Sequence, residues 1–414
     1  MKAGVPMKAG VTMKPGFAMN AAIKRLTVAI FCAAAVVGGP VARPAAASPS
    51  AASPTGASST AATSTGHVPV FAYFYQWFER SSWLRAKIDH ALAGDYSSDD
   101  PHVLREQIQE AQAAGIDGFL TSWKHTPSLD RRLELLLTIA ASEHFAVGVV
   151  YEALDFYRHP LPIATVRGDI TYLVRRWGPQ MRSAYFDRPV VVWTGTERYP
   201  VADVRSVHTA LGRGAYLLAA AKTVEGYERM AGDVDGEAYY WSSGNPRSSS
   251  TPAKLSALSA AVHRHRGIWL APAASGFDGR ALGGTRVILR DGGTTFRLSL
   301  DHAYASRPDA VGVISWNEWS ENTYIEPGRR YRAQELNVLR DYLQALTPGA
   351  PSPSASPAPP THSGAWSGFK ATVALILTCG IGLILLLILP QRRRRPAAHS
   401  LNASGERELS NTRP

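Results

Sequence analysis

The chain has 414 residues, a formal net charge of +11 and two cysteines. The excess positive charge lies largely beside apolar segments near both ends, most densely at residues 392–395, so it indicates membrane topology and argues against a nucleic-acid-binding protein. Both cysteines, Cys32 and Cys379, lie in those terminal segments, which excludes a disulfide, a thiol nucleophile and a cysteine-ligated metal from the middle of the chain.

Residues 1–47 have the pattern of a secretory signal peptide. Lys24 and Arg25 precede an apolar run that is too short to cross roughly 30 Å of hydrocarbon, and small residues follow up to Ala47. The pattern fits a chain that starts at Met19, which we interpret as the true start. Residues 48–66 consist almost entirely of Ser, Ala, Thr, Pro and Gly and predict a flexible linker.

A second apolar segment, at residues 369–390, predicts a transmembrane helix. At 1.5 Å per residue, its charge-free part spans close to the thickness of a bilayer. Residues 349–368 form a Pro/Ser-rich linker before it, and the arginines after it place the tail, residues 391–414, in the cytoplasm. We therefore expect a single-pass cell-membrane protein whose main domain is extracytoplasmic.

Residues 67–348 are long enough for one large α/β domain. Apolar runs predict strands at 70–75, 118–123, 147–151, 190–193, 216–221, 237–241, 268–271 and 311–316. Helical periodicity appears between them at 103–114, 129–142, 170–183, 201–211, 224–231 and 253–266. Eight strands alternating with helices predict a (β/α)8 TIM barrel. An open doubly wound sheet is the alternative, but no Gly-x-Gly-x-x-Gly follows the first run.

In such a barrel the active site lies at the carboxyl ends of the strands. Tryptophans close or follow four of the predicted strands, at Trp77, Trp123, Trp193 and Trp241. One tryptophan in this place is more often a packing residue, but four of them favour a carbohydrate-binding platform, because aromatic rings cover the apolar face of a sugar. We expect substrate contacts from Tyr75, Trp77, Trp123 and Trp241.

The last predicted strand leads into residues 314–327, ISWNEWSENTYIEP. Two glutamates lie there among three aromatic residues: Glu318, Glu321, Trp316, Trp319 and Tyr324. Two carboxyl groups supply the acid and the base that glycosidic cleavage requires, and their mutual repulsion in an apolar site separates their pKa values. A strand end whose carboxylates meet solvent or cap the next helix is the alternative.

Residues 317–327, NEWSENTYIEP, resemble the signature of glycoside hydrolase family 99, the endo-α-mannosidase-like enzymes, which reads roughly Asn-Glu-Trp-x-Glu-Gly-Thr-x-Ile-Glu-Pro. Residues 96–123 are similar to the second-strand region of that family, and residues 273–278 to its seventh-strand loop. The chain departs from the eukaryotic-type enzymes at three signature positions, where they have His, Gly and Gln: Ser320, Asn322 and Tyr324. These departures concern the substrate more than the class of enzyme.

The resemblance implies a barrel that cleaves internal α-mannosidic links with retention of configuration, the 2-hydroxyl of the sugar attacking C1. Glu318 would be the base that deprotonates this hydroxyl. Glu321 would protonate the leaving oxygen and then activate water. Further substrate-site residues implied by the resemblance are Glu152, Asn317, Tyr324 and Glu326.

Two other functions fit parts of the sequence. A polysaccharide-assembly transferase could use Asp233-Val-Asp235 as a metal–nucleotide motif, although this triplet precedes a predicted strand. A non-catalytic carbohydrate-binding barrel would keep the tryptophans without needing both Glu318 and Glu321. The sequence has no nucleophile elbow, His-Glu-x-x-His or phosphate-binding loop. We expect a glycan partner, no nucleic acid and no cofactor.

Overall fold

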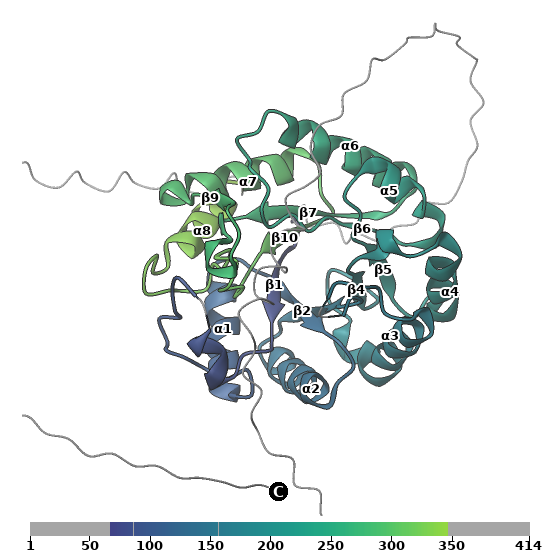
Figure 1. Ribbon diagram of the computed structural model, residues 1–414, viewed down its shortest axis with the longest axis horizontal. Coiled ribbons are helices and arrows are strands. Elements are labelled where there is room, and N and C mark those ends of the chain that lie inside the picture. The colour runs from purple at the N-terminus through teal and green to yellow at the C-terminus, as the bar shows by residue number, and fades with distance from the viewer. Residues whose placement is uncertain (1–66, 86, 156, 347–414) are drawn as a thin grey trace, which may run out of the picture. The chain divides into compact units, whose positions relative to one another are not determined.

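The computed structural model describes residues 67–346 except 86 and 156. Its barrel strands are β1 (Val70–Tyr75), β2 (Gly118–Trp123), β3 (Ala146–Tyr151), β4 (Val190–Trp193), β5 (Tyr216–Ala219), β6 (Gly236–Ala238), β7 (Ile268–Ala274) and β10 (Ala310–Ile314). Within the described residues these eight parallel strands close in the order β1-β10-β7-β6-β5-β4-β3-β2 (Figure 1). The predicted (β/α)8 barrel is therefore confirmed.

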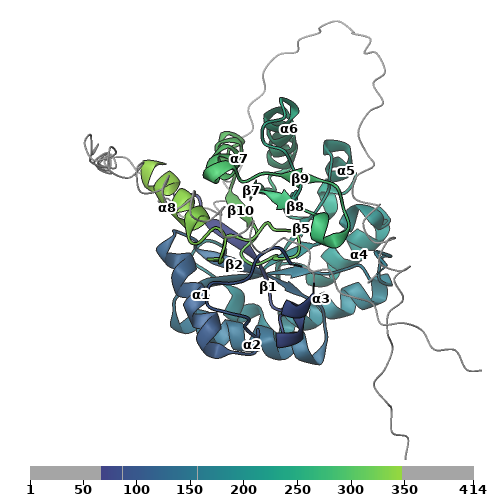
Figure 2. The ribbon, with the colours of Figure 1, turned by 60° about the vertical axis from the view of Figure 1, so that its left-hand side comes forward.

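The helices around the barrel are α1 (Pro101–Ala113), α2 (Pro127–Ser142), α3 (Ile163–Trp177), α4 (Val201–Leu211), α5 (Val224–Glu228), α6 (Ser250–Arg264), α7 (Thr294–Ala305) and α8 (Gln334–Leu346). Figure 2 shows this outer layer from a second direction. Short 3-10 helices add η2 (Arg80–Leu84), η3 (Gly178–Met181), η4 (Thr196–Arg198), η5 (Ala231–Asp233), η6 (Arg280–Leu282) and η7 (Asp291–Gly293). The strands β8 (Phe277–Asp278) and β9 (Val287–Ile288) form a separate antiparallel pair.

Local sequence explains the first helix well. Asp100 accepts a hydrogen bond from the His102 N–H at 2.9 Å, and Pro101 occupies the first turn, where its missing N–H costs nothing. Gly115, with φ of +87°, follows the helix end, as predicted. The predicted helix at 170–183 is wrong in its bounds: α3 runs from Ile163 to Trp177, and Gly178-Pro179 follows it. The helices α7 and α8 were not predicted.

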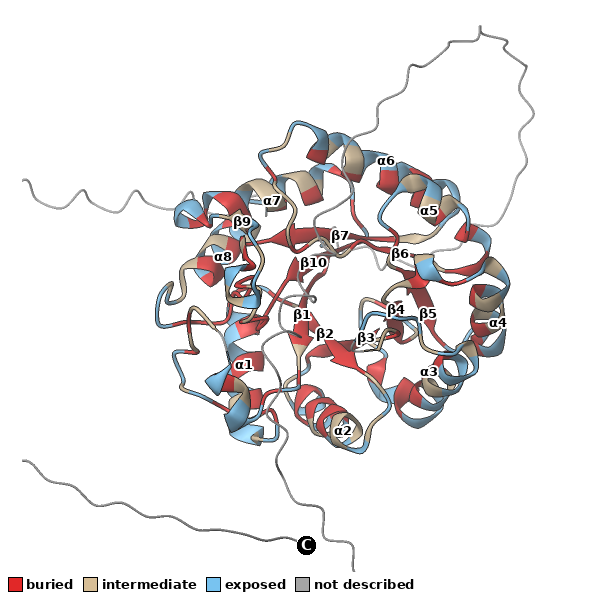
Figure 3. Ribbon diagram, viewed as in Figure 1, coloured by how far each residue is buried: buried red, intermediate tan, exposed pale blue. Residues whose placement is uncertain are grey.

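The strands are buried on both faces, so each carries two apolar sets (Figure 3). The inner set fills the barrel and includes Phe71, Tyr73, Leu120, Val150, Val192, Leu218, Ala238, Leu270 and Ile314. The outer set packs against the helices and includes Phe74, Phe119, Trp123, Tyr151, Trp193 and Trp269. Successive residues of a strand alternate between these sets, and this alternation decides which side chains reach the mouth of the barrel.

The expected signal peptide, both linkers, the transmembrane helix and the tail lie outside the described residues. Among the residues that the structure does describe, no helix is both long enough and apolar enough to span a membrane.

Candidate active site

The inner face of the barrel delivers polar side chains to the carboxyl ends of its strands. Tyr75 follows Tyr73 on this face, and Glu152 follows Val150. The Ser122 hydroxyl donates to Glu152 Oε1 at 2.9 Å, and the hydroxyls of Tyr75 and Tyr240 lie 2.8 Å apart. Strands far apart in the barrel wall therefore contribute groups to one mouth.

The segment after β10 turns back on itself above that mouth. The Ser315 N–H donates to the Thr323 carbonyl at 3.0 Å, and the Ile325 N–H donates to the Ser315 carbonyl at 2.9 Å. The Glu318 N–H donates to the Ser315 hydroxyl at 2.8 Å. We call residues 317–326 the carboxylate loop. Its turn includes Asn322, whose φ of +56° lies in the left-handed region that glycine and asparagine tolerate best, which explains how Asn replaces the Gly of the family signature.

Glu318 and Glu321 lie close enough in this loop to affect each other's ionisation. The Glu318 side chain is buried, and burial, followed by the charge of Glu321, raises its pKa to about 8. The Ser320 N–H, which donates to Glu318 Oε1 at 3.0 Å, and the ammonium of Lys87 act in the opposite direction. Burial also raises the pKa of Glu321, against the opposing effects of Ser242 and Arg158.

Tyr75 links the two glutamates to the other side of the mouth. Burial raises its pKa well above the usual value, and the charges of Glu318, Glu152 and Glu321 raise it further. Its hydroxyl therefore remains a proton donor among three carboxyl groups. The structure thus brings together Tyr75, Glu152, Glu318 and Glu321, as the sequence predicted, although their contact with a substrate stays a prediction.

An aromatic cluster supports the carboxylate loop from below. It comprises Phe78, Trp83, Tyr96, Trp319 and Tyr324. The rings of Trp319 and Tyr324 stack with centroids 3.8 Å apart. Glu326 accepts hydrogen bonds from Tyr96 at 2.8 Å, Gln107 at 2.6 Å and Trp319 at 3.1 Å, while burial raises its pKa to about 8.

Three residues predicted to bind substrate are instead buried within this support. Asn317, Tyr324 and Glu326 are between 0% and 4% exposed. The Tyr324 hydroxyl donates to Asp89, and both amide atoms of Asn317 bond to the Tyr75 backbone. Their side chains are occupied by the protein, so they position the mouth and offer no surface to a sugar.

The structure also contradicts the predicted platform of four tryptophans at Trp123 and Trp193, whereas substrate contacts of Trp77 and of the partly buried Trp241 stay predictions. Trp123 and Trp193 are fully buried on the outer faces of β2 and β4, and the Trp123 indole N–H donates to Asp130 at 3.0 Å. Trp241 packs on Tyr239 and lies under the ammonium of Lys254 in α6. Trp77 alone of the four is exposed, by 42%, with its ring 4.5 Å from that of Tyr75.

Tyr240 and Lys87 also belong to the site and were not predicted from the sequence. The alternation of side chains along β6 could have identified Tyr240. Tyr240 lies two residues after the inward-facing Ala238, whereas Trp241 lies two residues after the outward-facing Tyr239. Lys87 lies in an irregular segment after η2, where its ammonium donates to the Ser82 carbonyl at 2.6 Å. No local pattern marks its proximity to Glu318.

The Asp-x-Asp triplet lies away from the mouth. Asp233 pairs with Arg205 at 2.9 Å, and Asp235 accepts from the Leu217 N–H at 2.8 Å, at the amino ends of β5 and β6. A metal–nucleotide site at these residues is therefore not supported. Among the described residues, no group of three or more His, Cys, Asp or Glu is arranged to hold a metal ion.

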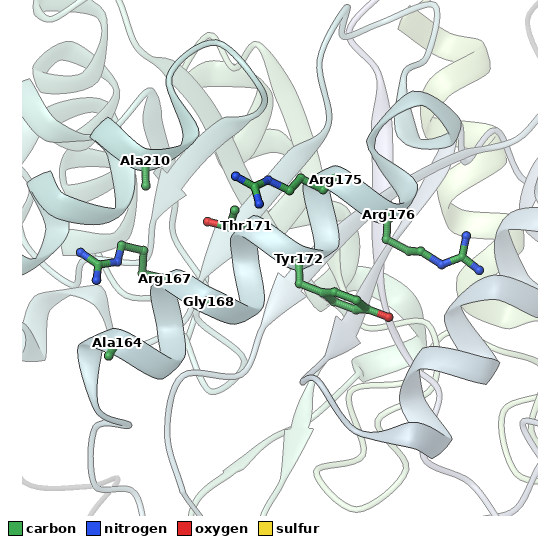
Figure 4. Close-up of a pocket in the computed structure, with 8 residues that line it drawn as sticks. All are labelled: Ala164, Arg167, Gly168, Thr171, Tyr172, Arg175, Arg176 and Ala210. Atoms are coloured by element: carbon green, nitrogen blue, oxygen red, sulfur yellow. The ribbon is translucent and has the colours of Figure 1, made fainter.

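A surface depression of about 700 Å³ lies elsewhere on the molecule. Its lining comes from α3 and α4 and includes Arg167, Tyr172, Arg175 and Arg176 (Figure 4). These helices lie outside the barrel wall (Figure 1), and none of the lining residues belongs to the strand ends. This depression is not part of the candidate active site.

A (β/α)8 barrel with two neighbouring glutamates after its last strand can supply the pair of carboxyl groups that glycoside hydrolysis requires. The profile of Glycosyl hydrolase family 99 matches residues 88–347, and the chain belongs to this family. It is accordingly a glycoside hydrolase.

The solved structures that resemble the chain have the same fold. The GH99 endo-alpha-mannosidase from Bacteroides thetaiotaomicron, in complex with BIS-TRIS-Propane, has a TM-score of 0.59 and 18% identity, over 67% of this chain and 96% of that one. A second structure of that enzyme has a TM-score of 0.58 and 17% identity, covering 67% and 98%. A "Glycoside hydrolase-like protein" has a TM-score of 0.55 and 13% identity, covering 66% and 93%. A search of curated protein sequences finds no match.

Proposed function

We propose that the protein is a membrane-anchored, extracytoplasmic endo-α-mannosidase that retains the configuration of the sugar. The observation that carries the proposal is the pair Glu318 and Glu321, which lie in one loop at the mouth of a family 99 barrel, with Glu318 buried. The endo-α-mannosidase structures from Bacteroides thetaiotaomicron support the mannosidic substrate class. The basic and apolar pattern of the terminal segments supports the anchor.

Burial and the charge of Glu321 raise the pKa of Glu318, and burial raises the pKa of Glu321, so the pair favours a state with one proton and one negative charge. The Ser320 N–H and Lys87 stabilise a charge on Glu318, and Ser242 and Arg158 stabilise a charge on Glu321. The place of each glutamate in the family signature supports Glu318 as the base and Glu321 as the acid that holds the proton.

In the proposed mechanism Glu318 removes the proton from the sugar's 2-hydroxyl, whose oxygen then attacks C1. Glu321 gives its proton to the departing glycosidic oxygen, so that the bond from C1 to that oxygen breaks. In the second step Glu321 takes a proton from water, whose oxygen attacks C1 and breaks the bond between C1 and the 2-oxygen, and Glu318 returns its proton to the 2-oxygen. The two inversions at C1 give net retention. Tyr75 and Glu152 lie where they can orient the sugar, and Trp77 offers an exposed ring for stacking.

Purified full-length protein in detergent tests this proposal on a panel of α-mannans and other α- and β-linked polysaccharides. Release of oligosaccharides from an α-mannan, with the α-anomer formed first, is the expected result. Release of single sugars from chain ends would contradict internal cleavage. Hydrolysis restricted to β-linked polymers would contradict the substrate class.

A further inference from the structure

The backbone of the carboxylate loop is held by side chains from the connection between β7 and α7. Arg290 lies in this connection, two residues after the end of β9. Its Nη2 donates to the Asn322 carbonyl at 3.0 Å and also to the Tyr324 carbonyl. Between these two acceptors, the Thr323 carbonyl accepts from the Ser275 hydroxyl at 2.9 Å. Three consecutive carbonyl groups thus accept hydrogen bonds from side chains of one neighbouring segment.

The connection between β7 and α7 also holds the backbone of Glu321, the residue before these three carbonyl groups. The Asp278 N–H donates to the Glu321 carbonyl at 2.8 Å. Asp278 therefore holds the carbonyl of Glu321, and Arg290 holds the carbonyls of Asn322 and Tyr324 that follow it. Because Asn322 adopts a left-handed conformation, small changes there would redirect the Glu321 side chain.

Arg290 reaches the loop through a closely fitted path. A Cβ on Gly276 would lie 2.9 Å from Arg290 Cγ, so the glycine leaves the room that the arginine stem needs. The guanidinium carbon lies 4.5 Å from the ring centroids of both Tyr324 and Tyr331. Glu335 of α8 supplies the counter-charge, with Oε1 at 3.4 Å from Arg290 Nη1, and both side chains are 2% exposed.

We propose that Arg290, neutralised by Glu335, is a positioning residue that places Glu321 for proton transfer to the leaving oxygen. It acts through the loop backbone and does not touch the reacting atoms. A buried ion pair is weak evidence for added stability, because desolvation of both charges offsets their attraction. Hydrogen bonds from one guanidinium to the carbonyls of Asn322 and Tyr324 instead fit a role in the geometry of the loop. This inference rests on the proposed role of Glu321 as the acid.

The test compares two substrates that share one α-mannoside unit. One carries a dinitrophenolate leaving group, which needs no protonation, and the other carries a sugar. The double variant Arg290→Met/Glu335→Gln removes both charges together and so avoids leaving one charge buried alone. We expect kcat to fall on the order of 10- to 100-fold for the sugar leaving group and about threefold or less for dinitrophenolate, with similar KM values.

Two controls separate positioning from stability. Arg205→Met removes a carboxylate-paired arginine at the other end of the barrel and should leave the ratio of the two rates unchanged. Arg290→Lys keeps a charge opposite Glu335, but its shorter side chain does not reach the place of Nη2. It should show the same leaving-group dependence, and it replaces the double variant if that variant fails to fold by circular dichroism.

Equal losses on both substrates, or losses that follow the folded fraction, would overturn the positioning role. Glu321→Gln is measured beside them to distinguish this failure from that of the proposed function. If Glu321→Gln shows the leaving-group dependence and the Arg290 variants do not, only the positioning inference is wrong. If Glu321→Gln itself shows no such dependence, the assignment of the acid is wrong, and the positioning inference falls with it.

Discussion

The side-chain amide of Asn317 bonds to both backbone groups of Tyr75. Its Oδ1 accepts from the Tyr75 N–H at 2.7 Å, and its Nδ2 donates to the Tyr75 carbonyl at 2.9 Å. The strands β10 and β1 are neighbours that close the barrel, and this amide extends their pairing beyond the strand ends. The residue before Glu318 therefore sets the position of Tyr75 at the end of the neighbouring strand.

Replacing Asn317 with Ala should lower both stability and activity. The Tyr75 backbone groups would lose their partners in a buried place, which costs about 1–3 kcal/mol. Thermal unfolding and kcat on one cleaved substrate measure the two effects. Asn337→Ala, on α8, is the control, because the exposed Asn337 side chain accepts a hydrogen bond from Arg340 at the surface. An Asn317→Ala protein with the melting temperature and kcat of the wild type would contradict this role.

Trp77 and Trp123 should respond in opposite ways to substitution. Trp77→Ala removes an exposed ring, so the fold should persist while KM rises, by about fivefold if stacking is worth on the order of 1 kcal/mol. Trp123→Ala empties a fully buried site between β2 and the helices and should destabilise the protein by about 3–5 kcal/mol. A raised KM in a stably folded Trp123→Ala protein would restore the discarded binding role.

The contrast between these tryptophans shows where the sequence could predict the site and where it could not. Apolar runs located the barrel strands, with small errors at their ends. Both faces of a barrel strand are buried, so a nearly continuous apolar run conceals which residues face inward. Side chains two residues apart in a strand share a face. Trp123 therefore faces outward like Phe119, and Glu152 faces inward like Val150.

Other parts of the site depend on contacts between segments far apart in the chain. Tyr96 donates to Glu326, and Arg290 donates to the carbonyls of Asn322 and Tyr324, across separations that no local pattern records. The motif predicted Glu318 and Glu321 as a pair because both residues lie in one short loop. It assigned Asn317, Tyr324 and Glu326 to the substrate because the motif says nothing about which of its side chains are already bonded within the protein.

The pH dependence of activity should shift in opposite directions in two variants. The charge of Glu321 raises the pKa of Glu318, so Glu321→Gln should lower that pKa and move the rising limb of the pH–rate profile to lower pH. Lys87 lowers the same pKa, so Lys87→Met should move the limb to higher pH.

The rates for this test are measured with a leaving group that needs no protonation, so that only the base is followed. Lys222→Met is the control, since Lys222 pairs with Glu197 and faces solvent. Shifts of the same sign in the Glu321 and Lys87 variants would show that the limb does not report Glu318.

The terminal segments should be processed differently, because one has the pattern of a cleaved signal peptide and the other that of a full membrane span followed by arginines. We expect the mature protein to begin near Ser48 and to sediment with membranes. Protease added to intact cells or spheroplasts should remove the barrel, as followed by an antibody to the barrel. A barrel that is degraded only after the cells are lysed would reverse the expected topology.

The most direct test of the proposed mechanism compares Glu318→Gln with Glu321→Gln on α-mannosides whose leaving groups differ in basicity. Loss of the base should reduce the first-step rate for every leaving group, because the 2-hydroxyl is no longer activated. Loss of the acid should reduce the rate strongly for a sugar leaving group and much less for dinitrophenolate, which departs without a proton. The account predicts this difference between the two variants. Equal activity of both variants and the wild type, on a substrate that the wild type cleaves, would remove Glu318 and Glu321 from the chemistry.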